Sequence, residues 1–472
     1  MPQLSEKKKL TLNSIALLAN RLTQGIATFI LTAAIARTLG AESLGQYLLA
    51  INYYYIFVNL ASQGFKTLFT RELTRSPEIT PVYLVSGTLL QLMFGLVGSI
   101  VMIGLVFLLP YSDQTSSICY IAAVMIIPFS LSNITEAIFQ AQEKMHLIAF
   151  STVPIYLLRL LAIIGIIQLN YGVAEVIWIL VGSETLILIV QWLLLIKIVK
   201  PNWQIDRDFI WQTIGTARTF FAMEGIGIIA SRVDILILSL LSNETLVGIY
   251  GGICQLLQPY YIVSNSVSLA AFPSMSKAVA ISKEKQQQIV ASTIETLLCL
   301  SLPFLVGIIA IGDRLLLLIY QDPSFIKETI ILHIVSISLI TGASSRVFSY
   351  LLIANGLEKL HLIEVVITTV IGNLAGIVLI SQYQLLGAAW MNLSIGFINF
   401  VVMTYFVYSR LFPLKVWQII RRPLLISGAM SIVFVVLNQL HLDTIITIIA
   451  AVIAYIALAS LIILRKPTNV SV

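Results

Sequence analysis

Five arginines lie inside long apolar stretches of this sequence, where charged side chains are uncommon: Arg21, Arg159, Arg218, Arg232 and Arg346. If these stretches cross a bilayer, each charge costs about 2.5–3.5 kcal/mol on insertion scales, so such side chains usually face a bundle interior or a watery cavity. A guanidinium group binds phosphate oxygens two at a time through its planar fork. The arginines therefore predict a binding site for an anion such as a diphosphate.

Arg218 and Arg232 are fourteen residues apart in one apolar stretch. On a helix they would lie about 40° apart around the axis and about 21 Å apart along it. This spacing favours a ladder of cations, to which Arg21, Arg159 and Arg346 would add further steps. Some of these side chains would instead reach the membrane surface or pair structurally, as Arg218 would near its helix start. Arg21 and Arg232 are our first choices for the site.

Four acidic residues also fall in apolar stretches: Glu136, Glu184, Glu224 and Asp234. A carboxylate in a cavity can exchange a proton or a sodium ion. We predict a coupling-ion site at Asp234, with Glu224 and Glu184 as further candidates. Charge balance for a neighbouring arginine is an equally good explanation. Apart from H⁺ or Na⁺, we expect no cofactor.

The sequence contains no constellation typical of an active site. Cys119, Cys254 and Cys299 lie in apolar stretches at unrelated spacings, which argues against a disulfide framework or a metal site. There is no metal-type Asp/His cluster and no glycine-rich phosphate loop in the sequence. We therefore predict no catalytic residues and no metal ligands, and expect a protein that is not an enzyme.

The elements that carry these charges are predicted to be membrane-spanning helices. The 472 residues are 58% hydrophobic and only 11% charged, against about 25% charged in soluble domains. A soluble helical solenoid would need polar helix faces, which segments such as Leu89–Leu109 lack. We predict an all-α integral membrane protein with about fourteen spans, near 12–37, 44–68, 83–109, 117–139, 148–168, 174–197, 211–240, 246–271, 290–311, 328–354, 362–381, 386–409, 424–440 and 445–464.

Lys and Arg between these spans predict the orientation. They concentrate in alternate loops, whereas the opposite side has only Arg37, Arg314 and Lys327. By the positive-inside rule, both termini are predicted to be cytoplasmic. The net charge of +6 is then explained by topology, and no nucleic-acid partner is needed to account for it.

An internal repeat organises the chain. "EKMHLI" (Glu143–Ile148) returns as "EKLHLI" (Glu358–Ile363), 215 positions later, and "LGAESLGQY" (Leu39–Tyr47) resembles "LSNETLVGIY" (Leu241–Tyr250). Parallel repeats of this kind are a transporter architecture with the substrate path at the repeat interface. We predict two parallel six-helix repeats around a central cavity, with two extra C-terminal helices. The predicted domains are a six-helix bundle at 1–199, a cytoplasmic linker at 200–210, a second bundle at 211–410 and two further helices at 411–472.

Several motifs resemble one family over nearly the whole chain. They are "ARTLGAESLGQY", "SRVDILILSLL" followed by "VGIY", "FPSMSKA", and "NGLEKLHL" followed by "LLGAAW". In this order they resemble the polysaccharide-biosynthesis (Wzx-type) flippases of the multidrug/oligosaccharidyl-lipid/polysaccharide exporter superfamily. The resemblance implies a V-shaped pair of helical bundles around a cavity. It carries no substrate-contacting residues over to this sequence, because the motifs are largely topological.

The resemblance also implies a function. The family moves undecaprenyl-diphosphate-linked oligosaccharides from the cytoplasmic to the outer leaflet of the bacterial inner membrane, for surface polysaccharides such as O-antigen. The partners it implies are the lipid-linked oligosaccharide and membrane lipids, together with polysaccharide polymerase and chain-length proteins.

Three other functions stay open. A cation-coupled drug exporter of the same superfamily would need an acidic pocket, and five arginines against four acids argue mildly against it. A peptidoglycan-precursor flippase is not excluded by charge. A membrane glycosyltransferase or polymerase would normally carry a large soluble loop or clustered acids at a membrane face, which this sequence does not show.

Overall fold

The structure, a computed structural model, describes residues 6–201, 203, 205–216, 232–440 and 442–464. All secondary structure within these ranges is helical, which confirms the predicted fold class. The chain forms two compact units, Met1–Gly248 and Ile249–Val472. Each unit has its own apolar core, built in the first around Phe65 and Phe69 and in the second around Leu297 and Val347.

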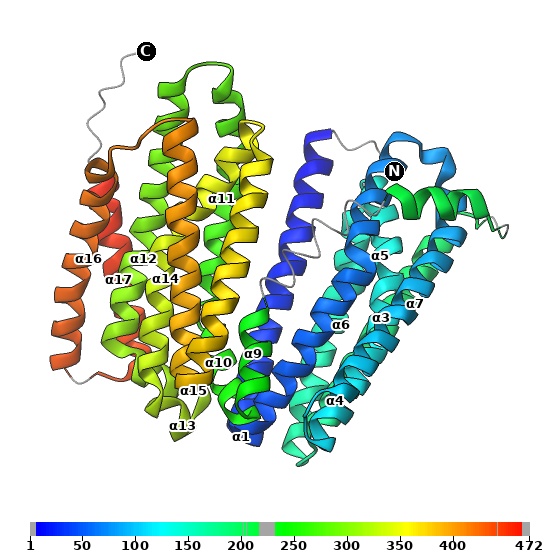
Figure 1. The fold of residues 1–472 in the computed structure, drawn as a ribbon, viewed down its shortest axis with the longest axis horizontal. Helices are drawn as coiled ribbons and strands as arrows, with labels where there is room; N and C mark the ends of the chain where they lie inside the picture. The colour runs from blue at the N-terminus through cyan, green and yellow to red at the C-terminus, as the bar shows by residue number, and fades with distance from the viewer. Residues whose placement is uncertain (1–5, 202, 204, 217–231, 441, 465–472) are drawn as a thin grey trace. The chain divides into compact units, whose positions relative to one another are not determined.

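The first unit is made mainly of long helices joined by short turns (Figure 1). Residues 207–216 are also helical. The other elements are α1 (Glu6–Arg75), η1 (Pro77–Ile79), α2 (Thr80–Val82), η2 (Tyr83–Gly87), α3 (Thr88–Leu108), α4 (Asp113–Val124), α5 (Ile126–Ala141), α6 (Met145–Gln168), α7 (Val173–Ile196) and α9 (Val233–Leu241), while α10 (Glu244–Gln255) continues into the second unit.

Local chemistry explains where these helices bend. Within α1, Gly40 has φ 84° and ψ 177°, a conformation that only glycine adopts without strain, and it separates the first two predicted spans. The break between α4 and α5 comes just before Pro128. Proline has no N–H to bond the carbonyl four residues earlier, so a helix is easily interrupted there.

In the second unit, two long helices each contain an internal break. α12 is non-helical at Ile311, and α15 turns at Gln384, where φ is 47° and ψ is −116°. The turn in α15 joins two apolar halves that pack closely, since a Cβ on Gly376 would overlap Met391. The elements are α11 (Gln258–Val279), α12 (Lys283–Tyr320), α13 (Pro323–Lys327), α14 (Thr329–Ala354), α15 (Glu358–Arg410), α16 (Val416–Gln439) and α17 (Thr444–Leu464).

The described helices are long and apolar enough for a multi-pass membrane protein. Nine of them could cross a membrane, or ten if the bent pair α10 and α11 forms one span. Two of the nine, Asn20–Arg75 and Glu358–Arg410, each cover two predicted spans. The seventh predicted span, 211–240, lies partly outside the described residues. The count of fourteen therefore stays a prediction.

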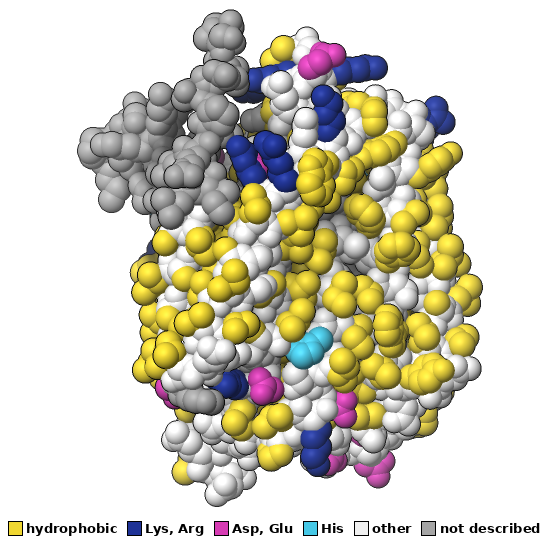
Figure 2. Space-filling model, turned by 90° about the vertical axis from the view of Figure 1, so that its left-hand side faces the viewer, with side chains coloured by type: hydrophobic (Ala, Val, Ile, Leu, Met, Phe, Trp, Pro, Cys, Tyr) yellow, Lys and Arg dark blue, Asp and Glu magenta, His cyan; other side chains and the backbone are white. Residues whose placement is uncertain are grey.

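The surface has the distribution of side chains that a bilayer requires. Figure 2 looks onto the side where α16 and α17 lie in Figure 1. Apolar side chains cover the middle of this face, and Lys, Arg, Asp and Glu side chains gather toward its two ends. Large exposed apolar residues such as Ile432, Ile453 and Ile456 are 60–67% exposed, which is expected of side chains that contact lipid.

The two related motifs Leu39–Tyr47 and Leu241–Tyr250 meet inside the first unit. A Cβ on Gly45 would lie 1.7 Å from the backbone O of Glu244, and a Cβ on Gly248 would lie 1.9 Å from the backbone O of Ala41. Gly45 and Gly248 are 203 positions apart, and so are Ala41 and Glu244, so each motif places its glycine against the same point of the other. α9 also packs against α1. This packing explains why the first unit ends at Gly248, later than the predicted linker 200–210. The predicted domain boundaries stay a prediction.

Candidate functional site

The predicted arginines and acids have different surroundings. Arg218 and Glu224 lie outside the described residues, so the predicted ladder from Arg218 to Arg232 stays a prediction. Arg21 is exposed on α1 and makes no ion pair within the described part of the chain. Arg159, Arg232 and Arg346 are partly buried and have defined neighbours.

Arg159 and Glu184 form an ion pair between α6 and α7. Arg159 Nη1 lies 3.1 Å from Glu184 Oε1, and the two side chains are only 11% and 8% exposed. The guanidinium also lies 4.6 Å from the ring centroid of Tyr156. A cation and an anion brought together in an apolar interior neutralise each other. This geometry corresponds to the charge balance that the sequence left open for Glu184, and Arg159 has little freedom to bind a ligand anion.

A second internal ion pair joins Lys66 of α1 to Glu136 of α5. Lys66 Nζ donates to Glu136 Oε2 at 2.5 Å, and both side chains are about one-fifth exposed. Gln191 Nε2 donates to Glu136 Oε1 at 3.5 Å and to Ser151 Oγ at 3.3 Å. Glu136 therefore has an ion-pair partner on α1 and a hydrogen-bond donor on α7.

Arg232 lies at the start of α9, against α1. Its Nη1 donates to Asn52 Oδ1 at 3.3 Å, and its guanidinium lies 5.1 Å from the ring centroid of Tyr55. Asn52 is buried, whereas Tyr55 is 37% exposed. Asp234 caps the first turn of the same helix by accepting from the N–H of Ile235. Arg232 is thus positioned by an amide and an aromatic ring, which leave part of its charge available.

Two other tyrosines, Tyr53 and Tyr111, connect α1 to α9. Tyr53 shares a hydrogen bond of 2.8 Å with Tyr111, which in turn contacts Ser239 Oγ at 2.8 Å. Burial raises the pKa of Tyr111, although its hydrogen bonds to Ser239 and Tyr53 act in the opposite direction. Tyr111 therefore stays a neutral hydroxyl and links α1, the loop after α3, and α9.

Arg346 opens onto a polar pocket in the second unit. The pocket has a volume of about 310 Å³, and Arg346 is the only charged residue among the described residues that line it. The guanidinium lies 5.8 Å from the ring centroid of Tyr261. Its Nε is buried without a hydrogen-bond partner in the described ranges. Hydroxyl and amide groups complete the lining, from Ser338, Ser345, Ser349, Asn392 and Asn399.

This pocket can hold an oxyanion. A guanidinium supplies several N–H donors in a planar fork, and the surrounding hydroxyls and amides can donate to further oxygens. Small residues on the facing helices, Gly342 and Gly396, leave the space open. Because an unpaired arginine is costly at membrane depth, the site favours an anion or polar ligand over an apolar one.

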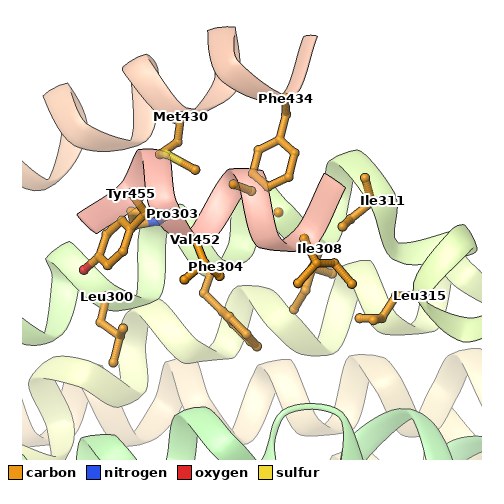
Figure 3. A pocket seen from close by; sticks show the side chains of 13 residues that line it. Leu300, Pro303, Phe304, Ile308, Ile311, Leu315, Met430, Phe434, Val452 and Tyr455 are labelled. Carbon is orange, nitrogen blue, oxygen red and sulfur yellow. The ribbon is translucent and has the colours of Figure 1, made fainter. Parts of the chain in front are cut away.

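A second pocket in the same unit is almost entirely apolar (Figure 3). It has a volume of about 340 Å³ and lies among α12, α16 and α17. Phe304 and Ile308 project into it from α12, Phe434 and Met430 from α16, and Val452 from α17. Tyr455 also lines it, but its hydroxyl donates to the backbone O of Cys299 at 3.2 Å. The pocket therefore suits a hydrocarbon chain.

Sequence reasoning missed one buried acid. Glu364 is 1% exposed and lies in α15, next to Asn399 of the Arg346 pocket. It was overlooked because it stands close to the predicted start of the span 362–381. The repeat offered a signal, since the equivalent position 215 residues earlier is Ala149. Because only the second repeat has a carboxylate at this position, the shared fold of the repeats does not explain Glu364.

The described residues offer no cluster of three or more His, Cys, Asp or Glu side chains that could hold a metal ion. The predictions of no metal and no catalytic constellation are not tested further by the structure.

Comparisons with known proteins agree with this architecture. Residues 10–279, more than half of the chain, match the sequence profile of a family described as "Polysaccharide biosynthesis protein". No curated protein is significantly similar in sequence.

Solved structures share the fold. A lipid II flippase, MurJ, in an inward closed conformation aligns with a TM-score of 0.75 and 17% identity, over 96% of this chain and 98% of that chain. An inward-facing multidrug resistance MATE family transporter of the MOP superfamily aligns with a TM-score of 0.67 and 14% identity, over 82% and 94%. A MOP superfamily transporter from Pyrococcus furiosus, with a binding pocket of reversed polarity according to its description, aligns with a TM-score of 0.60 and 14% identity, over 86% and 95%.

Proposed function

Because the chain belongs to the polysaccharide biosynthesis protein family and has the fold of MOP-superfamily flippases and transporters, we propose that it moves an undecaprenyl-diphosphate-linked oligosaccharide across a bacterial inner membrane. The lipid-linked glycan moves from the cytoplasmic to the outer leaflet by alternating access, and it serves the export or assembly of a surface polysaccharide such as O-antigen. Both termini are cytoplasmic in this proposal, and a polysaccharide polymerase and chain-length proteins act on the product.

The polar pocket of Arg346 carries the proposal. Its one charged lining residue is cationic, and the guanidinium makes no ion pair with any described residue. A diphosphate has several oxygens and a high negative charge, which match the fork of the guanidinium and the hydroxyls around it. Arg232 and Arg21 stay candidate phosphate contacts of the first unit, because neither makes an ion pair with a carboxylate in the described ranges. Arg159 is left out, since it is paired with Glu184.

The apolar pocket supports a lipid-linked substrate. A polyprenyl chain is a long hydrocarbon, and none of the described residues that line this pocket carries a charge. One unit therefore contains a polar pocket for the diphosphate and an apolar pocket for part of the chain. A cationic drug would find no acidic residue among the described residues of either lining, which favours the flippase over the drug exporter.

A peptidoglycan-precursor flippase is the second candidate. The fold match to a lipid II flippase over nearly the full length of both chains favours it. Both candidate substrates share the diphosphate and the polyprenyl chain, so the pockets described above serve either one. The glycan separates the two functions, and the family match favours the polysaccharide precursor.

Coupling to H⁺ or Na⁺ drives the cycle in this proposal. Asp234 is the first candidate for the coupling ion because it lies two residues from Arg232 in α9. Glu184 is a weaker candidate, since Arg159 already balances its charge. Glu224 stays a candidate from the sequence alone.

The test is transport of a defined substrate by purified protein in proteoliposomes. Wild-type protein should flip an undecaprenyl-diphosphate-linked oligosaccharide, and Arg346→Gln should reduce the rate at least about tenfold, because a charged hydrogen-bond pair is lost. Arg346→Lys should retain part of the rate, since it keeps the charge without the fork.

The matched control is Arg410→Gln, which removes the same charge from the exposed end of α15 and should leave transport unchanged. Full transport by Arg346→Gln would remove the polar pocket from the substrate path. Transport of a cationic dye, together with no movement of the lipid-linked glycan, would instead identify a drug exporter.

A further inference from the structure

Glu364 is a buried carboxylate that pairs with no Lys or Arg in the described ranges. Its Oε1 accepts from Thr368 Oγ1 at 2.9 Å and from Asn399 Nδ2 at 2.7 Å. Its Oε2 has no hydrogen-bond partner within the described part of the chain, and the same is true of His361 Nδ1. These two unsatisfied atoms lie 3.4 Å apart. A single proton placed between them would satisfy both, with one atom as donor and the other as acceptor.

In the first repeat, a buried acid is balanced by an arginine. Glu184 stands 215 positions before Asn399, and there it is paired with Arg159 of the preceding helix. The second repeat has Glu364 on the equivalent preceding helix and only an amide at Asn399. No Lys or Arg in the described ranges lies within 4.0 Å of Glu364. The imidazole of His361 is the one basic side chain among the described residues at that distance.

His361 gives the buried carboxylate a route to water. The His361 side chain is 32% exposed, whereas that of Glu364 is 1% exposed. A proton can therefore reach the imidazole from outside the helix bundle and pass to the carboxylate. Histidine is suited to this transfer, because its charge changes near neutral pH.

Asn399 joins this pair to the Arg346 pocket. Its Nδ2 donates to Glu364, while its Oδ1 is buried without a partner in the described residues. Asn399 and Arg346 line the same pocket. Arg346 lies eight residues before the end of α14 and Glu364 six residues after the start of α15, about 12 Å and 9 Å along their helices. The two charges thus lie at a similar depth, on helices that pack together.

The charged and titratable groups that face the pair are few. His361 comes from the same half of α15, and Arg346 comes from α14 across the pocket. The second half of α15 contributes the neutral Asn399. Tyr261 of α11 lines the pocket on the far side, and Tyr350 of α14 is turned to Phe272.

We propose that His361 and Glu364 form a proton-binding pair that controls the affinity of the Arg346 pocket for an anion. With one proton the pair is neutral, and the charge of Arg346 is free to attract a phosphate or another oxyanion. When the proton leaves, the pair carries one negative charge, which competes with the ligand for Arg346. Proton and anion therefore bind together, and each increases the affinity for the other by the same factor. The proposal rests on the proposed role of this pocket in binding a diphosphate.

The experiment measures binding of radioactive sulfate to the purified full-length protein by equilibrium dialysis. Sulfate keeps the same charge across the range titrated, so its own protonation does not contribute. Between about pH 5 and pH 8, wild-type affinity should fall about tenfold. Glu364→Gln should bind sulfate at every pH with the affinity that the wild type has at low pH, because the amide imitates the protonated acid.

Two variants separate this proposal from the proposed function. Arg346→Gln should abolish sulfate binding at every pH, and Glu358→Gln, which removes an exposed carboxylate from the start of the same helix, should keep the wild-type pH dependence. If sulfate binding requires Arg346 but depends on pH in Glu364→Gln as it does in the wild type, the proposed proton pair is wrong and the anion pocket is retained. Absence of Arg346-dependent binding in the wild type overturns the anion pocket, and with it the linkage proposed here.

A second measurement reports on the pair without a ligand. The Nδ1 resonance of His361 in ¹⁵N-histidine-labelled protein can be assigned by its loss in His361→Asn. It should respond to pH differently in Glu364→Gln than in the wild type, because the partner that shares the proton has changed. The same titration of this resonance in both proteins would overturn the pair.

Discussion

Arg159 and Arg346 both lie in long apolar helices, but their surroundings differ. Arg159 has the Glu184 carboxylate at 3.1 Å, whereas Arg346 makes no ion pair in the described ranges and opens onto a pocket. A paired charge in an apolar interior is stabilised by its partner, and an unpaired one needs water or a ligand. We therefore assign a structural role to Arg159 and a binding role to Arg346.

The structural role of Arg159 predicts a specific pattern of stabilities. Arg159→Met leaves Glu184 buried without its cation, which should cost about 3–5 kcal/mol of folding free energy. The double variant Arg159→Met/Glu184→Gln removes both charges together, so it should recover most of that loss. Thermal denaturation in detergent, followed by circular dichroism, would show a much lower Tm for the single variant than for the double variant.

Transport by the double variant provides the control for this prediction. If Arg159 only balances Glu184, the double variant should flip substrate at close to the wild-type rate. A double variant that is as stable as the wild type but does not transport would contradict the structural role and return Arg159 to the diphosphate site.

Helix packing in the first unit depends on two glycines that approach a neighbouring backbone. Gly45 on α1 and Gly248 on α10 each lie where a Cβ would come within 2 Å of a carbonyl oxygen of the other helix. A contact with backbone cannot be relieved by a side-chain rotation. The related motifs therefore carry glycine at these positions for a steric reason.

We expect Gly45→Ala and Gly248→Ala to destabilise the first unit. Each added methyl group would have to push the helices apart, at a cost of about 1–3 kcal/mol or more. The control is Gly104→Ala on α3, where no atom lies within 4 Å of an added Cβ, and alanine should there be neutral or stabilising. Tm values of the three variants check the prediction, and an unchanged Tm for Gly45→Ala would show that α1 and α10 do not pack as closely as described.

The helices themselves could be predicted because hydropathy determines where they cross the membrane. The predicted span 174–197 corresponds to α7 at Val173–Ile196. The predicted span 290–311 is much shorter than α12 at Lys283–Tyr320, because the helix includes a polar segment at its start and continues beyond the break at Ile311. Ser282 begins α12 by accepting from the N–H of Lys285, a cap that the hydropathy pattern does not report.

The sites were less predictable, because they depend on pairings between helices. The sequence placed Arg159 and Glu184 in successive spans but did not fix which faces meet. The Arg346 pocket is lined by serines of α14 and by asparagines in the second half of α15. That half follows the turn at Gln384. Glu364 was missed as a buried acid because it stands near the predicted edge of a span. The repeat, which sets it against Ala149, contained the missing information.

At the scale of the whole molecule, the proposed function requires binding sites for both ends of an amphiphilic substrate, and the two pockets differ in polarity as this requires. Both pockets belong to the second unit, one lined by Arg346 and hydroxyl or amide groups and the other by α12, α16 and α17. α16 and α17 follow the predicted six-helix repeats in the chain, so the apolar pocket depends on helices that lie outside the predicted repeats. A protein that moves only the polar head group would not need this pocket.

This division predicts that filling the apolar pocket will discriminate between substrates by chain length. Ala451 lines the pocket from α17 and is 6% exposed, so Ala451→Phe would place a ring in the space proposed for the polyprenyl chain. Transport of a long-chain lipid-linked glycan in proteoliposomes should fall several-fold, while a short-chain analogue with the same diphosphate should be moved at the wild-type rate. Ile453→Phe adds the same ring at an outer position that is 63% exposed, and it should affect neither substrate. Equal loss for both chain lengths in Ala451→Phe would show that the pocket supports the fold of α12, α16 and α17 and does not receive the lipid.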